Sequence, residues 1–182
     1  MFIKGKSGDI ADVNKSGEQL TSALIQTMMA RANDNGDAYC AVVEADPNGL
    51  DKDFFYLKNL DDKDLRIYKI RMSTGTADID VDIKLGVTGS PGSGTAVNPM
   101  NMNAAYGADA QNRVTCEYRD EDLALTGGTV VDTLYIDKDF VGEQEFDYPA
   151  EIILPKNMTL VFNNVGVDPT ADIKCEVFFY FN

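Results

Sequence analysis

Apolar and charged residues alternate most regularly between residues 77 and 87. Ile79, Val81, Ile83 and Leu85 alternate there with Asp78, Asp80, Asp82 and Lys84. A period of two places the four aliphatic side chains on one face of a β-strand and the charges on the other. The segment therefore predicts an antiparallel strand with one face in the core and the other in water.

Short apolar or aromatic runs recur along most of the chain, separated by Pro, Gly, Asn and Asp residues that favour turns. They predict about ten strands at intervals of roughly 8–15 residues, the spacing of a β-sandwich or jelly roll. The last run reaches the end of the chain, so we expect the C-terminal residues to be part of a sheet. The clearest strands are expected at 38–44, 53–60, 65–73, 77–87, 114–118, 130–136, 151–154, 158–163 and 173–181.

The alternation also predicts which side chains form the core of the sandwich. Besides the four aliphatic residues of the 77–87 segment, we expect inward-facing residues on each later strand. These are Leu134, Ile152, Leu160, Phe162, Val177 and Phe179.

Residues 1–36 differ from the rest of the chain because their apolar residues are sparse. We expect them to form an extended N-terminal arm, and residues 37–182 to form the sandwich domain. The arm has room for one short helix at 22–32, where Ser22 suits the N-cap and four apolar residues share a face. The turn-forming residues 33–37 would end that helix.

The isolated apolar residues of the arm are candidates for contact with a partner. Phe2, Ile3, Ile10 and Val13 stand in polar surroundings and have no core of their own. We expect them to lie against another subunit. The alternative is that they pack on the sheet of their own chain.

The net charge of the chain argues against two classes of binding partner. The chain has 16 basic and 30 acidic residues, for a net charge of -14. Nucleic-acid binding relies on Lys and Arg that neutralise phosphates, so neither nucleic acid nor an anionic membrane is an expected partner. Because no apolar run approaches the roughly 18 residues of a membrane span, and the N-terminus has no apolar signal segment, we expect synthesis in the cytoplasm.

Catalytic chemistry has little support in the sequence. The chain has no His, which removes the usual general base near neutral pH and the His-dependent nucleophilic schemes. A glycosidase needs only two placed carboxylates, and Glu151 and Glu176, each beside an apolar run, are the nearest candidates. Solvent-facing strand positions explain both more simply, so we expect no enzyme and no catalytic residue.

Metal and cofactor sites are not expected either. The acidic segments 33–37, 61–64, 78–82 and 137–139 lack the ligand spacing of a calcium loop, and Asp and Asn favour turns in any case. Three thiols without a CxxC pair indicate neither a disulfide framework nor a zinc site. Cys40, Cys116 and Cys175 each lie in or beside an apolar run, which predicts buried thiols in a protein made in a reducing cytoplasm.

Several short motifs in this order resemble a known group of proteins. They are Asp12-Val13-Asn14, Asn35-Gly36-Asp37-Ala38-Tyr39, Tyr56-Leu57-Lys58-Asn59, Asn98-Pro99-Met100-Asn101-Met102-Asn103, Leu125-Thr126-Gly127-Gly128-Thr129 and Ile152-Ile153-Leu154-Pro155-Lys156-Asn157-Met158-Thr159-Leu160. Together they resemble small virion proteins of tailed phages, similar to capsid decoration, cement or head-fibre proteins with a jelly-roll-like β-sandwich. The resemblance covers most of the chain and includes no catalytic motif.

The resemblance implies a structural virion protein on the outer surface of the capsid. Its partners would be the major capsid protein and further copies of itself, as a homotrimer. The alternative is a receptor- or glycan-binding virion module, at a head-fibre tip or in the tail. Exposed aromatic residues clustered at loop tips, such as Tyr106 or Tyr118, would favour the alternative, whereas a flat apolar base would favour decoration.

Overall fold

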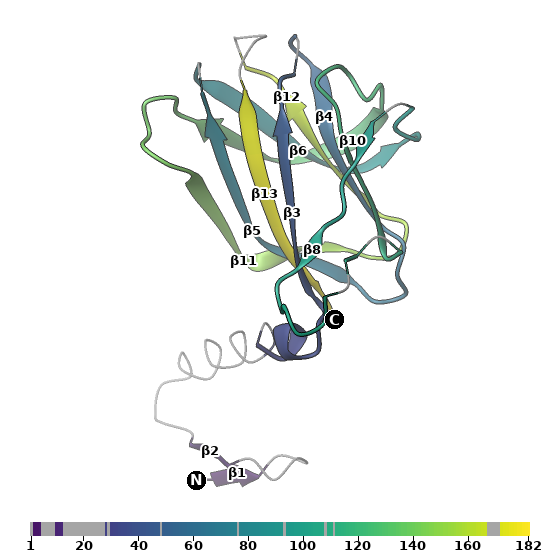
Figure 1. Cartoon of the computed structure of the whole chain (residues 1–182), viewed down its shortest axis with the longest axis vertical. Coiled ribbons are helices and arrows are strands. Elements are labelled where there is room, and N and C mark those ends of the chain that lie inside the picture. Colours follow the sequence, from purple (N-terminus) through teal and green to yellow (C-terminus); the bar gives the residue numbers. More distant parts are fainter. Residues whose placement is uncertain are drawn as a thin grey trace.

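Two antiparallel sheets pack face to face in the computed structural model of the chain (Figure 1). The structure describes residues 2–4, 10–12, 28, 30–47, 49–75, 77–92, 94–107, 109–110, 112–166 and 172–182. All the long elements among them are strands. The predicted fold class, an all-β antiparallel sandwich, is confirmed.

One sheet has five strands and the other has six. The five-stranded sheet has the order β11 (Gln144–Leu154), β5 (Leu65–Thr74), β13 (Ile173–Phe181), β3 (Ala38–Ala45) and β8 (Met100–Asn101). The six-stranded sheet has the order β10 (Thr126–Ile136), β6 (Ile79–Thr88), β12 (Thr159–Asn164), β4 (Lys52–Asn59), β9 (Val114–Tyr118) and β7 (Thr95–Ala96).

Apart from β9, the eight long strands of the sandwich pair in a nested order. β3 pairs with β13, β4 with β12, β5 with β11 and β6 with β10, so the first four strands meet the last four in reverse. Nested antiparallel pairing across two sheets is the arrangement expected of a jelly-roll-like sandwich. The chain between β6 and β10 supplies β7, β8 and β9, which extend the two sheets on the side away from β10 and β11.

The inner faces of both sheets form one apolar core. Nine of the ten predicted core residues are buried there; Leu85, the tenth, is half-buried and packs against the same cluster. The alternation of inward and outward side chains in β6 is broken just beyond Leu85. The cause is Gly86, whose φ of 71° is one that L-residues rarely adopt. Val87 consequently packs on the outer side of the sheet, with Tyr56, Leu123 and Val161.

Two strands begin earlier than the sequence predicts. β10 starts at Thr126, where Gly127 and Gly128 have φ values of 74° and 89° and conceal the strand pattern. A Cβ on Gly128 would lie 2.6 Å from Cγ2 of Val87, so only glycine fits. β11 starts at Gln144 and continues past Pro149. An edge strand tolerates a proline, and Pro149 lies where the pairing of β11 with β5 is interrupted.

The structure describes two short strands of the arm. β1 (Phe2–Lys4) and β2 (Ile10–Asp12) pair with each other as a separate two-stranded sheet, with Phe2 opposite Asp12 and Lys4 opposite Ile10. Of the predicted helix, described residues 28, 30 and 31–34 are helical, two residues beyond the expected end. Residues 22–27 and Val13 lie outside the described part of the chain.

We expect the sandwich to depend strongly on Phe162, whose ring centroid lies 4.9 Å from that of Phe55 and which is fully buried. Phe162→Ala should lower the free energy of unfolding by about 3–5 kcal/mol, because it leaves a cavity between the sheets. Urea unfolding followed by circular dichroism measures the change. Val141→Ala, at a side chain 97% exposed, is the control and should change stability by less than about 0.5 kcal/mol. Equal effects of the two substitutions would contradict the assigned core.

Candidate functional site

The outer face of the five-stranded sheet is unusually apolar towards the C-terminal end of β13. Tyr68, Phe178 and Tyr180 lie together there, with ring centroids 6.2 Å apart for Tyr68 and Phe178 and 6.3 Å for Tyr68 and Tyr180. An outward-facing strand surface normally carries polar side chains. This departure makes the outer face the first candidate for an interaction surface.

Neighbouring strands continue this surface. β3 contributes Cys40 and Val42, and β8, which pairs beside Cys40, contributes Met100 with 63% of its surface exposed. Met102 follows and accepts a 3.6 Å hydrogen bond from the Tyr68 hydroxyl at its sulfur. We name as the apolar face the residues Cys40, Val42, Tyr68, Met100, Met102 and Phe178.

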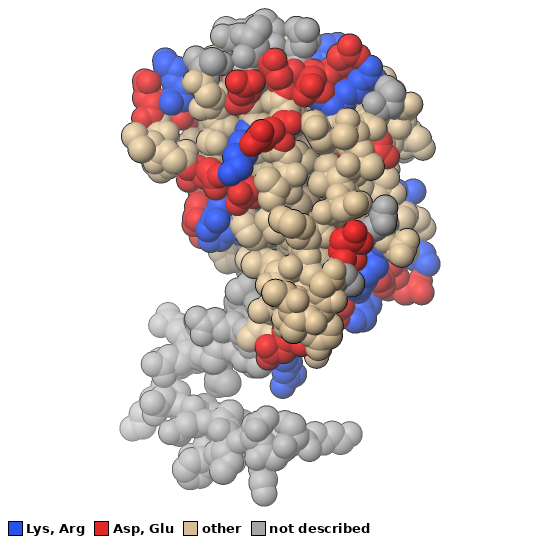
Figure 2. Space-filling view, viewed as in Figure 1, with Lys and Arg blue, Asp and Glu red and all other residues tan. Residues whose placement is uncertain are grey.

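Charged side chains lie mostly around the apolar face, although Arg71 covers part of Phe178. Figure 2 shows uncharged side chains in the middle of this side of the molecule, with charged ones gathered at its upper end and along its left side. The charged group beside β13 includes Arg71, whose guanidinium carbon lies 5.0 Å from the centroid of the Phe178 ring, and Glu176, which pairs with Arg71 at 3.6 Å. A surface with an apolar centre and a polar rim is typical of protein–protein interfaces.

A shallow hollow of about 280 Å³ adjoins the apolar face where the arm reaches the sandwich. Tyr68, Met102 and Tyr180 line it from the sandwich, and Ala30 and Asn33 line it from the helical end of the arm. The hollow therefore joins the apolar face to the base of the arm.

Glu151 supports this surface from the neighbouring strand β11. Its carboxylate accepts a 2.5 Å hydrogen bond from the Tyr180 hydroxyl and forms a 3.0 Å ion pair with Arg66. Its backbone φ is 55°. Burial, together with the bond to Glu151, raises the pKa of Tyr180. Glu151 is thus held in a structural network, and its side chain is only 15% exposed.

The solvent-facing interpretation of Glu151 and Glu176 is therefore incomplete, because both face away from the core but neighbouring side chains cover most of their surface. The Glu176 side chain is 16% exposed and pairs with Lys174 at 3.3 Å as well as with Arg71. Alternation along a strand predicted that both carboxylates would face away from the core, but it could not show that basic residues on adjacent strands cover them. Both are engaged with basic or hydroxyl partners.

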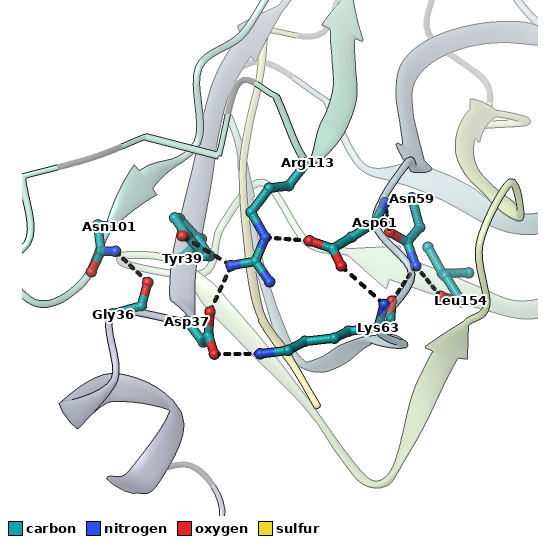
Figure 3. Close-up of polar contacts among 9 residues, drawn as sticks. All are labelled: Gly36, Asp37, Tyr39, Asn59, Asp61, Lys63, Asn101, Arg113 and Leu154. Atoms are coloured by element: carbon teal, nitrogen blue, oxygen red, sulfur yellow. Dashed lines mark hydrogen bonds and ion pairs between the residues drawn. The ribbon is translucent and has the colours of Figure 1, made fainter.

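Arg113 fixes the point at which the arm joins the sandwich (Figure 3). Its Nη1 donates to Asp37 Oδ1 and its Nε donates to Asp61 Oδ2, both at 2.6 Å. Lys63 adds a 2.9 Å ion pair to Asp37. We call Arg113, Asp37, Asp61 and Lys63 the Arg113 clamp. It joins residues just before β3 and β9 to the loop between β4 and β5.

Neighbouring side chains hold the Arg113 clamp in place. The guanidinium carbon of Arg113 lies 3.7 Å from the centroid of the Phe181 ring at the end of β13, a cation–π geometry. Asn59 is fully buried and donates from Nδ2 to the carbonyls of Lys63 and Leu154, both at 2.8 Å. The base of the arm is consequently tied to both sheets.

The loop after β8 holds the arm from the other side. Asn101 Nδ2 donates to the Gly36 carbonyl at 2.6 Å, and Asn103 Nδ2 donates to the Asn33 carbonyl at 2.8 Å. Gly36 has a φ of 72°, and a Cβ there would lie 2.5 Å from Cγ of Tyr106. These contacts pair the carbonyls at the end of the helical segment with side chains of the 101–103 segment.

The aromatic residues expected to distinguish the two virion functions have different environments. Tyr118 is half-buried and packs against the core, whereas Tyr106 is 52% exposed and its ring rests on Gly36. Only one of the two is therefore an exposed aromatic side chain.

The four predicted contact residues of the arm are not brought to the apolar face by the described contacts. Phe2, Ile3 and Ile10 lie on the separate two-stranded sheet, and Val13 falls outside the described residues. Their contact with a capsid or subunit stays a prediction. Sequence reasoning missed Arg113, Asn101 and Asn103, whose partners lie 52 to 76 residues away in the sequence.

Turns and burial account for the acidic segments and the thiols. Asp61 and Asp137 each accept a hydrogen bond from the backbone N–H two residues later, as turn-forming aspartates do. Within the described residues no group of three or more His, Cys, Asp or Glu side chains is placed to hold a metal ion. Cys116 and Cys175 are buried as predicted, and Cys40 is half-buried, where burial raises the pKa of its thiol to about 12.

Comparison with known proteins adds no relative. Neither a family model, a curated protein nor a solved structure matches the chain. No helix within the described ranges is both long enough and apolar enough to span a membrane.

The Arg113 clamp predicts a loss of stability in acid. Burial alone would raise the pKa of Asp37, but hydrogen bonds and attraction from Lys63 and Arg113 outweigh it, so the pKa is lowered; Asp61 is affected in the same direction. A carboxyl with a lowered pKa stabilises the fold above its unfolded pKa of about 3.9, and this contribution is lost as pH falls through the folded value. The free energy of unfolding should therefore fall below about pH 4.

Arg113→Gln tests this assignment, because it removes the charge and keeps hydrogen-bond donors. We expect it to lower the free energy of unfolding at pH 7 by about 2 kcal/mol and to reduce the loss between pH 5 and pH 3, measured by urea unfolding. Lys156→Gln is the control, because Lys156 pairs with Asp62, whose side chain is 89% exposed. An unchanged pH dependence in Arg113→Gln would show that the acid sensitivity originates elsewhere.

Proposed function

We propose that this chain is a structural virion protein that binds the outer surface of a phage capsid and decorates or cements the shell. The apolar face is the observation that carries the proposal. Its exposed Val42, Met100 and Met102 adjoin the half-buried rings of Tyr68 and Phe178. Contiguous exposed apolar surface on a soluble domain marks an interaction site. The sequence motifs that resemble decoration proteins give the class of partner, the major capsid protein.

The distribution of charge supports one orientation on the particle. The chain has a net charge of -14, yet the centre of the apolar face is uncharged (Figure 2). Interfaces exclude charge from their centres and place it at the rim. In the proposed orientation the apolar face meets the shell and the acidic parts face the medium, where negative charge favours solubility.

The base of the arm fits the same orientation. The Arg113 clamp and the loop after β8 fix the arm beside the hollow that adjoins the apolar face. An arm that leaves the sandwich at the edge of its docking surface is placed to contact the shell or a neighbouring subunit. The homotrimer that the resemblance implies stays a prediction.

The first experiment locates the protein on the particle. Purified particles of the phage that encodes the chain are labelled with a gold-conjugated antibody to it and viewed by electron microscopy. The proposal predicts label distributed over the head. Label restricted to the tail would favour the receptor- or glycan-binding alternative, and particles without label would refute the virion assignment.

Met100→Asp tests the apolar face itself. A carboxylate buried in an apolar interface loses its hydration without gaining a partner, so we expect binding to protein-free particles to weaken at least about tenfold. The measurement is cosedimentation of purified protein with particles that lack it. Val141→Asp adds the same charge at a side chain 97% exposed on another part of the molecule and should bind as the wild type does. Equal binding by both variants would exclude the apolar face as the docking surface.

A further inference from the structure

The outer edge of β10 differs from the other sheet edges of the molecule. β10 pairs with β6 on one side, and no described strand pairs with its other side. It is 11 residues long, and every residue from Thr126 to Thr133 is exposed. An unpaired edge of this length presents a row of backbone N–H and C=O groups to which another strand can bind.

The other three edge strands of the two sandwich sheets are short or protected. β7 and β8 have two residues each. β11 contains Pro149, three acidic residues and an interruption of its pairing between Asp147 and Ile152. Short edges, prolines, charges and interrupted pairing are the features that prevent edge-to-edge association.

β10 has fewer of these features, although its pairing with β6 is interrupted at Val131. Its sequence, Thr-Gly-Gly-Thr-Val-Val-Asp-Thr-Leu-Tyr-Ile, contains no proline and one charged residue, Asp132. Asp132 accepts a 2.9 Å hydrogen bond from the Tyr148 hydroxyl of β11, so its carboxylate already has a partner within the chain. Val130 and Val131 are each 48% exposed, and Tyr135 is 55% exposed. The edge is therefore long, apolar and nearly free of charge.

The charge of the chain indicates what this edge binds. Two copies that each carry a net charge of -14 repel one another, so they associate most readily through a surface with little charge. β10 has one charged residue in 11, whereas 25% of the chain is charged. This favours a second copy of the chain over a partner selected by opposite charge.

The order of residues in β10 suits antiparallel pairing with itself. A two-fold axis at Val131 would place Thr129 opposite Thr133, and Asp132 opposite Val130 of the other copy, so that the two aspartates do not face each other. Val131 is also the position that the pairing with β6 skips, and such an extra residue leaves its backbone unpaired within the sheet.

We propose that β10 pairs antiparallel with β10 of a second copy, about a two-fold axis at Val131, and joins the two six-stranded sheets into one. Two-fold contacts use the same surface on both subunits and are the commonest form of self-association. The two-fold pair and the homotrimer implied by the resemblance are competing assemblies, with two and three chains respectively, and the pair does not depend on capsid binding.

Sedimentation velocity of the purified full chain tests the pairing. The wild type should sediment as a particle with twice the 19.9 kDa mass of the chain. Val131→Lys places charges on both sides of the axis and should weaken association at least about tenfold. Ile153→Lys, at a residue 40% exposed on the edge strand β11, should leave the dimer intact. A wild type with the mass of one or three chains, or a Val131→Lys variant that dimerises as the wild type does, would overturn the proposal.

A cysteine at the axis tests the geometry independently. Opposed residues of antiparallel strands have Cα atoms about 4.5–5.5 Å apart, within reach of a disulfide. In a Cys40→Ser background, Val131→Cys should form a covalent dimer on mild oxidation, seen on a non-reducing gel. Val141→Cys is the control for random collision and should crosslink at least about tenfold more slowly. Equal rates, or no crosslink at Val131→Cys, would contradict the two-fold axis.

Discussion

The structure depends on the burial of two central strands, β12 and β13, each paired on both sides. β13 lies between β3 and β5, and β12 lies between β4 and β6. These strands satisfy their backbone groups within the sheets, and the inward side chains of β13 and all six residues of β12 are buried. The nested pairing follows, because the last strands of the chain must be inserted beside the first.

The same strand β13 determines where a partner can bind. Its outward side chains change along its length from Lys174 and Glu176 to Phe178 and Tyr180. The outer face is therefore charged at one end and apolar at the other. Phe181, at the apolar end, lies under the guanidinium of Arg113, so that packing in the centre of the sheet also positions the base of the arm.

Period-two patterns were sufficient to predict the fold class and the core. β6 and β13 alternate clearly, and their inward residues are buried as expected apart from the partial exposure of Leu85. The first halves of β10 and β11 were not predicted as strands, because they contain glycines and a proline. An edge strand with irregular pairing or side-chain alternation tolerates these residues. Such tolerance depends on the neighbouring strand and cannot be read from a local pattern.

The candidate site was harder to predict than the core. Cys40, Val42 and Phe178 were recognised as strand residues, but only the sheet order shows that they form one surface with Met100 and Met102. The Arg113 clamp joins residues 52 and 76 positions apart in the chain. Polar side chains in loops give little local indication of such partners, whereas apolar alternation reports burial directly.

Different surfaces of the sandwich thus suit different contacts. The apolar face offers side chains to a partner, whereas the β10 edge offers backbone groups and little charge, and the remaining surface has the acidic residues that keep the protein soluble. A cryo-electron microscopy reconstruction of the particle tests the central claim most directly. Our account predicts a two-sheet density outside the shell, with the five-stranded sheet and its apolar face turned towards the capsid protein. A sandwich turned with its acidic end towards the shell, or density confined to the tail, would contradict it.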